Sequence, residues 1–106
     1  MKKPIFKERE QDIVNAIIEY LRYKRFCTFR MNSGAIMTSK GRMVRLSPIG
    51  TPDILAIKDG KATFFEVKVG SNKPTFFQEQ KMIELEAFGA KCFVVYSVEE
   101  VKKIVG

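Results

Sequence analysis

The dipeptide Asp59-Gly60 constrains the fold more strongly than any other feature of this 106-residue sequence. It lies between two apolar runs, Ile54-Leu55-Ala56-Ile57 and Phe64-Phe65. A type I′ turn needs positive φ at both central positions, which Asp-Gly supplies, and it joins two antiparallel strands. Both runs are apolar at consecutive positions, which is typical of central strands covered by helices. The sequence therefore predicts a buried β-hairpin.

The register of this hairpin brings charged side chains together. If the turn has two residues, Lys58 pairs with Lys61, and Asp53 falls opposite Glu66 with Cβ atoms roughly 5 Å apart. Lys68 lies two residues beyond Glu66 and points to the same face. Two carboxylates in apolar surroundings have raised pKa values unless a cation lies between them, and Mg²⁺ or Mn²⁺ suits oxygen ligands. A plain ion pair at a strand end is the alternative, but it does not explain all three residues on one face.

Composition limits the classes of function. A chain of 106 residues suits a single domain over residues 1–106. The net charge of +7 favours a polyanionic partner, nucleic acid or a membrane surface, although a merely soluble basic surface would give the same value. The absence of histidine excludes histidine bases, Ser-His triads and histidine-ligated zinc.

The cysteines and the N-terminal segment bear on location. Cys27 and Cys92 are isolated within apolar runs, which indicates reduced thiols of a cytoplasmic protein. No apolar signal-peptide core follows Met1-Lys2-Lys3-Pro4, and no run approaches membrane-spanning length. We therefore expect a cytoplasmic protein that does not associate with a membrane.

Apolar residues at helical spacing predict a first helix over residues 6–24. Glu10 lies in the middle of its apolar arc, whereas Glu8 and Asp12 point toward water. An acid on an apolar face is costly unless a partner pairs with it. Glu10 therefore either faces the acidic site or caps a frayed first turn.

A second helix begins after Thr75, with Gln78 at the capping-box position and Gly89 as its C-terminal stop. Gln80 is central on the apolar face of this helix, and Gln78 faces away from it. The apolar face consists of Phe76, Phe77, Ile83, Ala87 and Phe88. A glutamine there needs buried partners, which the acidic site or the backbone could supply.

The remaining segments complete an α/β pattern. A strand is predicted over 26–31, a break at 32–34, a possible short strand over 43–46 and a strand over 91–96. The last strand should be parallel to the second strand of the hairpin, by a right-handed crossover. The capping box Ser97–Glu100 then opens a final helix through Val105.

Basic residues flank the predicted acidic site in the sequence. Lys40, Arg42 and Arg45 lie in the loop ahead of it, and Lys73 lies in the loop after it. They suggest phosphate contacts. A solvated hairpin is the alternative for the residues of the first loop.

Pro52-Asp53 followed by Glu66-Val67-Lys68 resembles the PD-(D/E)XK nuclease signature. The segment Gly50-Thr51-Pro52-Asp53-Ile54 is similar to the form found in the VRR-NUC (virus-type replication-repair nuclease) branch. The resemblance implies a restriction-endonuclease-like αβββαβ core, in which helices cover both faces of a mixed sheet. It also implies a metal-dependent DNA endonuclease, in a phage or bacterial cell interior.

We expect Asp53 and Glu66 to bind Mg²⁺ or Mn²⁺, and the resemblance implies the Val67 carbonyl as a third ligand. Lys68 would orient or deprotonate the attacking water. The family carries a glutamate on its first helix and a glutamine at the start of the later one. The matching residues in this sequence are Glu10 and Gln80. The resemblance implies that Glu10 holds a second metal and that Gln80 positions Lys68 or the scissile phosphate.

Small stand-alone proteins of this branch resemble junction resolvases. The resemblance therefore implies a homodimer acting on branched DNA such as four-way junctions. Two alternatives remain at this point: a non-catalytic nucleic-acid-binding module on the same fold, and a metal-dependent hydrolase of small phosphates. An intact Asp53–Glu66–Lys68 set argues against the first, and the lack of a glycine-rich cradle argues against the second.

Overall fold

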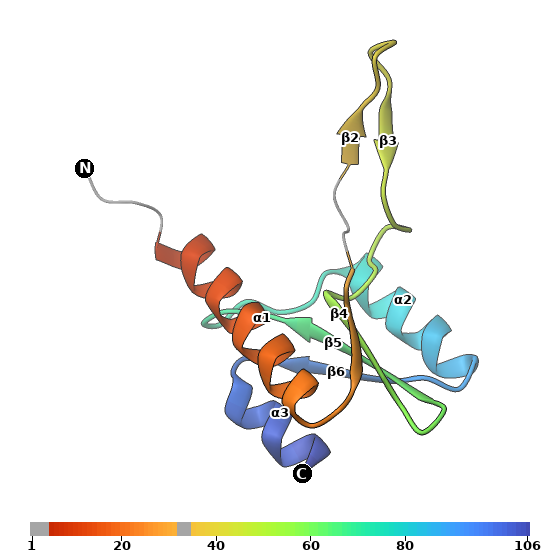
Figure 1. Cartoon of the computed structure of the whole chain (residues 1–106). Helices are drawn as coiled ribbons and strands as arrows, with labels where there is room; N and C mark the ends of the chain where they lie inside the picture. Colours follow the sequence, from red (N-terminus) through yellow and green to blue (C-terminus); the bar gives the residue numbers. More distant parts are fainter. Residues whose placement is uncertain (1–4, 32–34) are drawn as a thin grey trace.

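The computed structural model describes residues 5–31 and 35–106, with side chains from residue 9 onward in the first helix (Figure 1). In chain order its elements are α1 (Ile5–Tyr23), β1 (Cys27–Arg30), β2 (Ala35–Met37), β3 (Met43–Arg45), β4 (Ile54–Lys58), β5 (Lys61–Val67), α2 (Phe76–Ala87), β6 (Lys91–Val95) and α3 (Val98–Val105). The predicted helices and strands are all present. The predicted break at 32–34 lies outside the described residues.

The main sheet has four strands in the order β1-β4-β5-β6. β1, β4 and β5 are antiparallel neighbours, and β6 is parallel to β5. The parallel pair is linked through α2, as the sequence predicts. The sheet is therefore mixed, which confirms the predicted fold class.

The β4–β5 hairpin has the predicted turn and register. Asp59 and Gly60 have φ values of 53° and 74°. Lys58 pairs with Lys61, and Ile54 pairs with Phe65 at the other end of the ladder. One further step along the same register places the residue before Ile54 opposite the residue after Phe65. These residues are Asp53 and Glu66.

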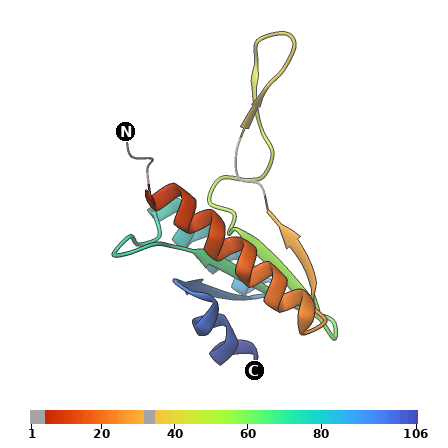
Figure 2. The ribbon, with the colours of Figure 1, turned by 60° about the vertical axis from the view of Figure 1, so that its left-hand side comes forward.

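The core lies between the sheet and the helices α1 and α3, which cover one face (Figure 2). The α1 residues Val14, Ile17, Ile18 and Leu21 follow helical spacing and are all buried. The sheet and α3 contribute Ile54, Ala56, Phe65, Val67, Val95 and Val101. Because side chains alternate along a strand, the residues between these in sequence point to the opposite face.

Helix α2 covers part of that opposite face and begins as predicted. Thr75 Oγ1 accepts from the Gln78 N–H, and the Gln78 side chain accepts from the Thr75 N–H, which completes a capping box. However, none of the α2 residues is buried. The half-buried ones are Gln78, Lys81, Met82 and Leu85. The predicted apolar face of α2 is exposed to solvent instead.

Residues 35–46 form a separate two-stranded ribbon, here called the arm, which stands away from the body of the molecule (Figures 1 and 2). Ile36 pairs with Val44, and Met37 pairs with Met43. Among the described elements, β2 and β3 contact each other and no other helix or strand. Only the second strand of this ribbon was predicted from the sequence.

None of the helices in the described part of the chain is both long and apolar enough to cross a membrane.

Candidate metal centre and catalytic site

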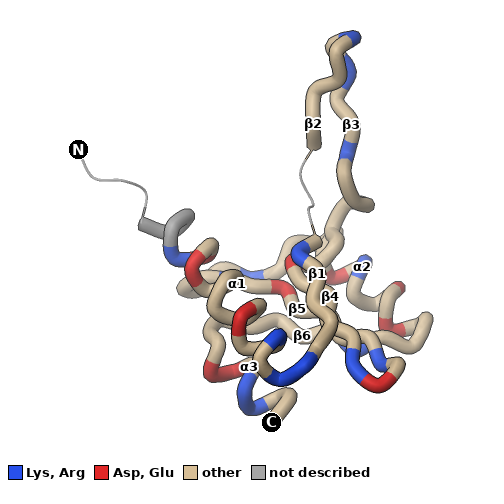
Figure 3. The backbone as a smooth tube through the Cα atoms, viewed as in Figure 1, with Lys and Arg blue, Asp and Glu red and all other residues tan. Residues whose placement is uncertain are grey.

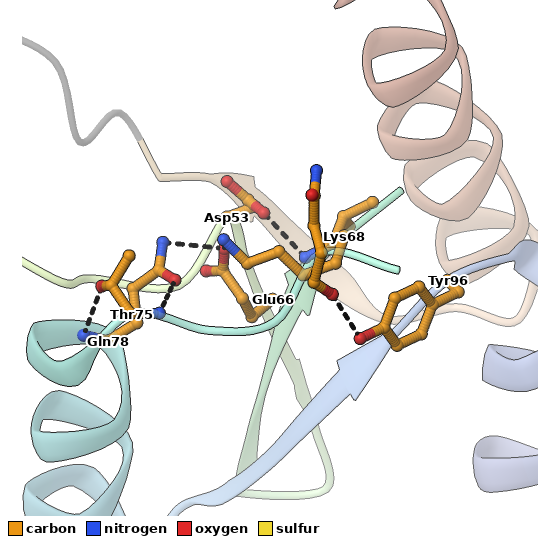
Figure 4. Close-up of polar contacts among 8 residues, drawn as sticks. Asp53, Glu66, Lys68, Thr75, Gln78 and Tyr96 are labelled. Atoms are coloured by element: carbon orange, nitrogen blue, oxygen red, sulfur yellow. Dashed lines mark hydrogen bonds and ion pairs between the residues drawn. The ribbon is translucent and has the colours of Figure 1, made fainter. Parts of the chain in front are cut away.

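Asp53 and Glu66 lie at neighbouring strand ends. Asp53 directly precedes β4, and Glu66 is the last residue but one of β5. The Val67 N–H donates to Asp53 Oδ2 at 2.7 Å, which fixes the Asp53 side chain across the hairpin (Figure 4). Glu66 is only 3% exposed and points to the α2 face of the sheet, because Phe65 and Val67 on either side of it belong to the core under α1.

Lys68 completes the predicted group. Its Nζ atom lies 3.4 Å from Glu66 Oε2, and its side chain is 15% exposed. Its N–H donates to the Val95 carbonyl at 3.0 Å, so the chain stays tied to β6 just beyond the end of β5. The Tyr96 hydroxyl donates to the Asn72 carbonyl at 2.6 Å, which holds the loop that leads on to α2. The geometric part of the prediction, three charged residues at one end of the hairpin, is confirmed.

The electrostatics of the two acids follow from their burial. Burial, and then the neighbouring Asp53 carboxylate, raises the pKa of Glu66 to about 8, and Lys68 offsets this only in part. The pKa of Asp53 is also raised, chiefly by burial, although the hydrogen bond from the Val67 N–H acts against the shift. One lysine is therefore too little positive charge for two ionised carboxylates at this position.

One atom tests whether a cation fits. Glu66 Oε1 is buried, and it has no hydrogen-bond partner among the described residues. A buried carboxylate oxygen without a partner costs free energy, which a bound cation would recover. Two carboxylates suit Mg²⁺ or Mn²⁺, which keep several waters and need few protein ligands. The residues present therefore fit the predicted metal.

Glu10 lies near the pair but not within it. Its negative charge raises the pKa of both Asp53 and Glu66. Its side chain is exposed, and no cluster of three acidic, histidine or cysteine side chains suited to a metal occurs among the described residues. The expectation that Glu10 occupies a buried apolar face was wrong, because from residue 9 onward the first buried side chain of α1 is that of Val14, one turn later.

Each of the two α2 glutamines faces the side of the helix that was predicted for the other. Gln78, which the helical pattern predicted to face away from the site, donates from Nε2 to Glu66 Oε2 at 3.1 Å. Gln80, which the pattern turned toward the site, is exposed and lines a groove between α2 and β6. The prediction that Gln78 faces away was wrong because it assumed that the apolar face of α2 is the buried face.

Gln78 links the start of α2 to the acidic pair. Its Oε1 accepts from the Thr75 N–H at 2.9 Å, while its Nε2 donates to Glu66 (Figure 4). A single amide group thus caps the helix and orients a carboxylate. The capping-box spacing was visible in the sequence, so the signal for this residue was present.

Gly50 allows α2 to approach the segment that carries Asp53. Its φ is +83°, and a Cβ atom there would lie 2.3 Å from the Phe77 carbonyl oxygen. Only glycine permits both this conformation and this approach. The glycine of the Gly50-Thr51-Pro52-Asp53 motif therefore holds the start of α2 against the loop before β4.

The predicted phosphate-binding residues are all exposed. Lys40, Arg42 and Arg45 lie on the arm, and Lys73 lies in the loop before α2. Figure 3 shows the basic residues at the tip and along one strand of the arm.

Seven chains of solved structures match this protein. One of them, described as "VRR_NUC domain", superposes with a TM-score of 0.66 and 24% sequence identity, over 92% of this chain and 94% of its own. No protein-family model and no curated protein matches the chain. The chain therefore has the fold of a VRR_NUC domain, as the sequence resemblance implied.

Proposed function

We propose that this protein is an Mg²⁺- or Mn²⁺-dependent endonuclease that hydrolyses phosphodiester bonds in DNA. The observation that carries the proposal is the buried Asp53–Glu66 pair, with Lys68 beside it and one Glu66 oxygen left without a partner in the described chain. A surface that only binds DNA needs no buried acids, whose desolvation is costly. The fold of a nuclease-type family supports the same choice.

The carboxylates of Asp53 and Glu66 would hold the cation, with the Val67 carbonyl as a third ligand. The cation supplies neutralisation of the phosphate charge and a more acidic water. Lys68 would orient or help deprotonate the attacking water and offset charge on the phosphate. Glu10 would hold a second cation, directly or through water.

The substrate we propose is branched DNA, with four-way junctions as the best fit. Lys40, Arg42 and Arg45 on the arm, together with Lys73, contact phosphates, and their contribution weakens as salt rises. One acidic pair cuts one strand. Concerted cleavage of two strands therefore needs two copies, and a two-fold homodimer supplies them with a symmetry close to that of the junction.

A cleavage assay with four-way junction, flap, nicked and linear DNA tests the proposal, with Mg²⁺, Mn²⁺ or a chelator present. Asp53→Asn, Glu66→Gln and Lys68→Ala should each lower the cleavage rate by about a thousandfold, because several kcal/mol of charge stabilisation are lost. DNA binding in a gel-shift assay should persist in all three variants. Asp59→Asn, an exposed acid at the far end of the same hairpin, is the matched control.

Two results would contradict the proposal. Full metal-dependent activity in Asp53→Asn would mean that the site is elsewhere. If the wild-type protein bound branched DNA but cleaved none of the substrates with either metal, the protein would be a non-catalytic binding module on the same fold.

A matched pair of variants compares how much Gln78 and Gln80 each contribute to the cleavage rate. Gln78→Glu keeps the oxygen that caps α2 but loses the donor to Glu66, so it should lower the cleavage rate by about 10- to 100-fold, as for other residues that orient metal ligands. Gln80→Glu should have a smaller effect. A larger loss at Gln80 than at Gln78 would instead support the assignment made from the sequence.

A further inference from the structure

Two apolar surfaces of the described part of the chain are exposed to solvent. The first is the arm, where Ile36 and Val44 are 50% and 44% exposed on one face, and Met37 and Met43 are 62% and 64% exposed on the other. An isolated two-stranded ribbon is marginally stable in water, and one with apolar residues on both faces needs a surface to cover it.

The second surface is the exposed side of α2. Phe76 and Ile83 are 66% and 60% exposed and lie on the same side of the helix as Glu79 and Glu86. A groove of about 430 Å³ runs beside them, between α2 and the edge strand β6. Its lining is formed by Glu79, Gln80, Met82, Ile83, Glu86, Cys92 and Val94. We call this groove, together with the exposed Phe76 beside it, the α2 groove.

The charges of the two surfaces are complementary. Residues 35–46 include Lys40, Arg42 and Arg45 and no acid, a charge of +3. Helix α2 has three glutamates against one lysine, a charge of −2. Each surface therefore combines exposed apolar side chains with a charge opposite to that of the other, the pattern expected of two sides of one interface.

Within the described chain, the arm strands make no contact with α2, although Gly50 beyond the arm lies against Phe77 at the start of that helix. The arm leaves the sheet after the edge strand β1 and returns to it at β4, whereas the α2 groove borders β6 at the other edge. The arm also points away from the body in both views (Figures 1 and 2). A second copy of the chain can present its groove to this arm and receive the partner's arm in return.

We propose that two copies exchange arms, with the Met37–Met43 face of each arm, which also carries Arg45, seated in the α2 groove of the other. This deepens the homodimer of the proposed function and rests on it. DNA is the other candidate occupant of the arm. It matches the basic residues but offers little apolar surface for Met37 and Met43, so the arm would use its tip for phosphates and its strands for the second copy.

Sedimentation of the metal-free protein without DNA tests this assembly independently of catalysis. The wild type should be a dimer at micromolar concentration. Met43→Glu on the arm and Ile83→Glu in the groove should each raise the dimer dissociation constant by about tenfold or more, as expected for central apolar contacts. Both residues are exposed in the single chain, so neither change should unfold it. Tyr23→Glu, 79% exposed at the end of α1, is the control and should not affect the dimer.

A covalent test distinguishes exchange from self-docking. Cys92 lines the groove, whereas Cys27 is exposed, so both cysteine variants are made in a Cys27→Ser background. In that background Met43→Cys should form a disulfide-linked dimer through Cys92 under mild oxidation, and Tyr23→Cys should not. A 43–92 disulfide within one chain would overturn the exchange.

Two sedimentation results would also overturn it: a monomeric wild type, or a dimer insensitive to both glutamate variants. A gel-shift assay gives a third such outcome, an arm variant that weakens DNA binding and leaves the dimer unchanged. In the second case the homodimer and the nuclease proposal would stand without the arm exchange. Metal-dependent cleavage of nicked DNA, measured on the same variants, reports separately on the nuclease proposal.

Discussion

The protein contains two β-hairpins that differ in what covers them. Both are antiparallel, and both have a glycine with positive φ in the turn, Gly60 at 74° and Gly41 at 79°. In β4–β5, Ile54 and Phe65 are fully buried. In the arm, the apolar residues are 44–64% exposed. Turn chemistry thus determines that a hairpin forms, and its neighbours determine whether its apolar residues become core or a surface for a partner.

The same difference separates two kinds of site. The covered hairpin carries Asp53 and Glu66, whose oxygens would have to be held within a small tolerance to share a cation, and paired strands supply this. The uncovered hairpin carries Lys40, Arg42 and Arg45, which would need only to approach a flexible phosphate backbone. The more demanding chemistry lies on the more rigid element.

The largest expected difference between the two hairpins is in stability, measured by truncating one apolar side chain in each. Phe65→Ala should lower the free energy of unfolding by about 3–5 kcal/mol, because it leaves a cavity among buried residues. Val44→Ala should change it by less than about 0.5 kcal/mol. Urea denaturation at several protein concentrations measures both, since docking of the arm would add a concentration-dependent part. Equal losses at low concentration would show that the arm is part of the cooperative core.

The pH dependence of stability should come from the covered hairpin alone. The folded-state pKa of Glu66 is raised from 4.5 to about 8, so between these values the folded chain binds a proton that the unfolded chain does not. The stability contributed by this group is complete below pH 4.5 and is lost as the pH rises through about 8. Asp53 shifts in the same direction. The Tm should therefore fall over this range, and Glu66→Gln should flatten the profile.

Bound metal should oppose the fall in Tm at higher pH. A cation competes with the proton for the same carboxylates, so Mg²⁺ or Mn²⁺ should raise the Tm more at pH 8 than at pH 5. Asp59→Asn, on the exposed turn, should leave both profiles unchanged. A metal-induced rise in Tm that is equal at both pH values, or that persists in Glu66→Gln, would place the metal away from Glu66.

The features that the sequence predicted correctly depend on local chemistry. The Asp59-Gly60 turn fixes the hairpin register, and the Thr75–Gln78 capping box fixes the start of α2. The features that it missed depend on tertiary environment. Helical periodicity identifies the apolar face of α2, but it cannot tell a face that packs on the sheet from one left open. For that reason Gln80 was expected where Gln78 lies.

The two turn glycines give the most local test of the difference between the hairpins. Both lie where an added Cβ would meet nothing within 4 Å, so replacement by alanine costs only the backbone strain of positive φ, about 1–2 kcal/mol. Gly60→Ala should lower the free energy of global unfolding by this amount, because β4–β5 opens only when the core does. Gly41→Ala should leave global unfolding unchanged and instead speed hydrogen exchange of the arm amides, because the arm can open by itself. If Gly41→Ala lowered global stability as much as Gly60→Ala, the two hairpins would form one cooperative unit, and the contrast between them would fail.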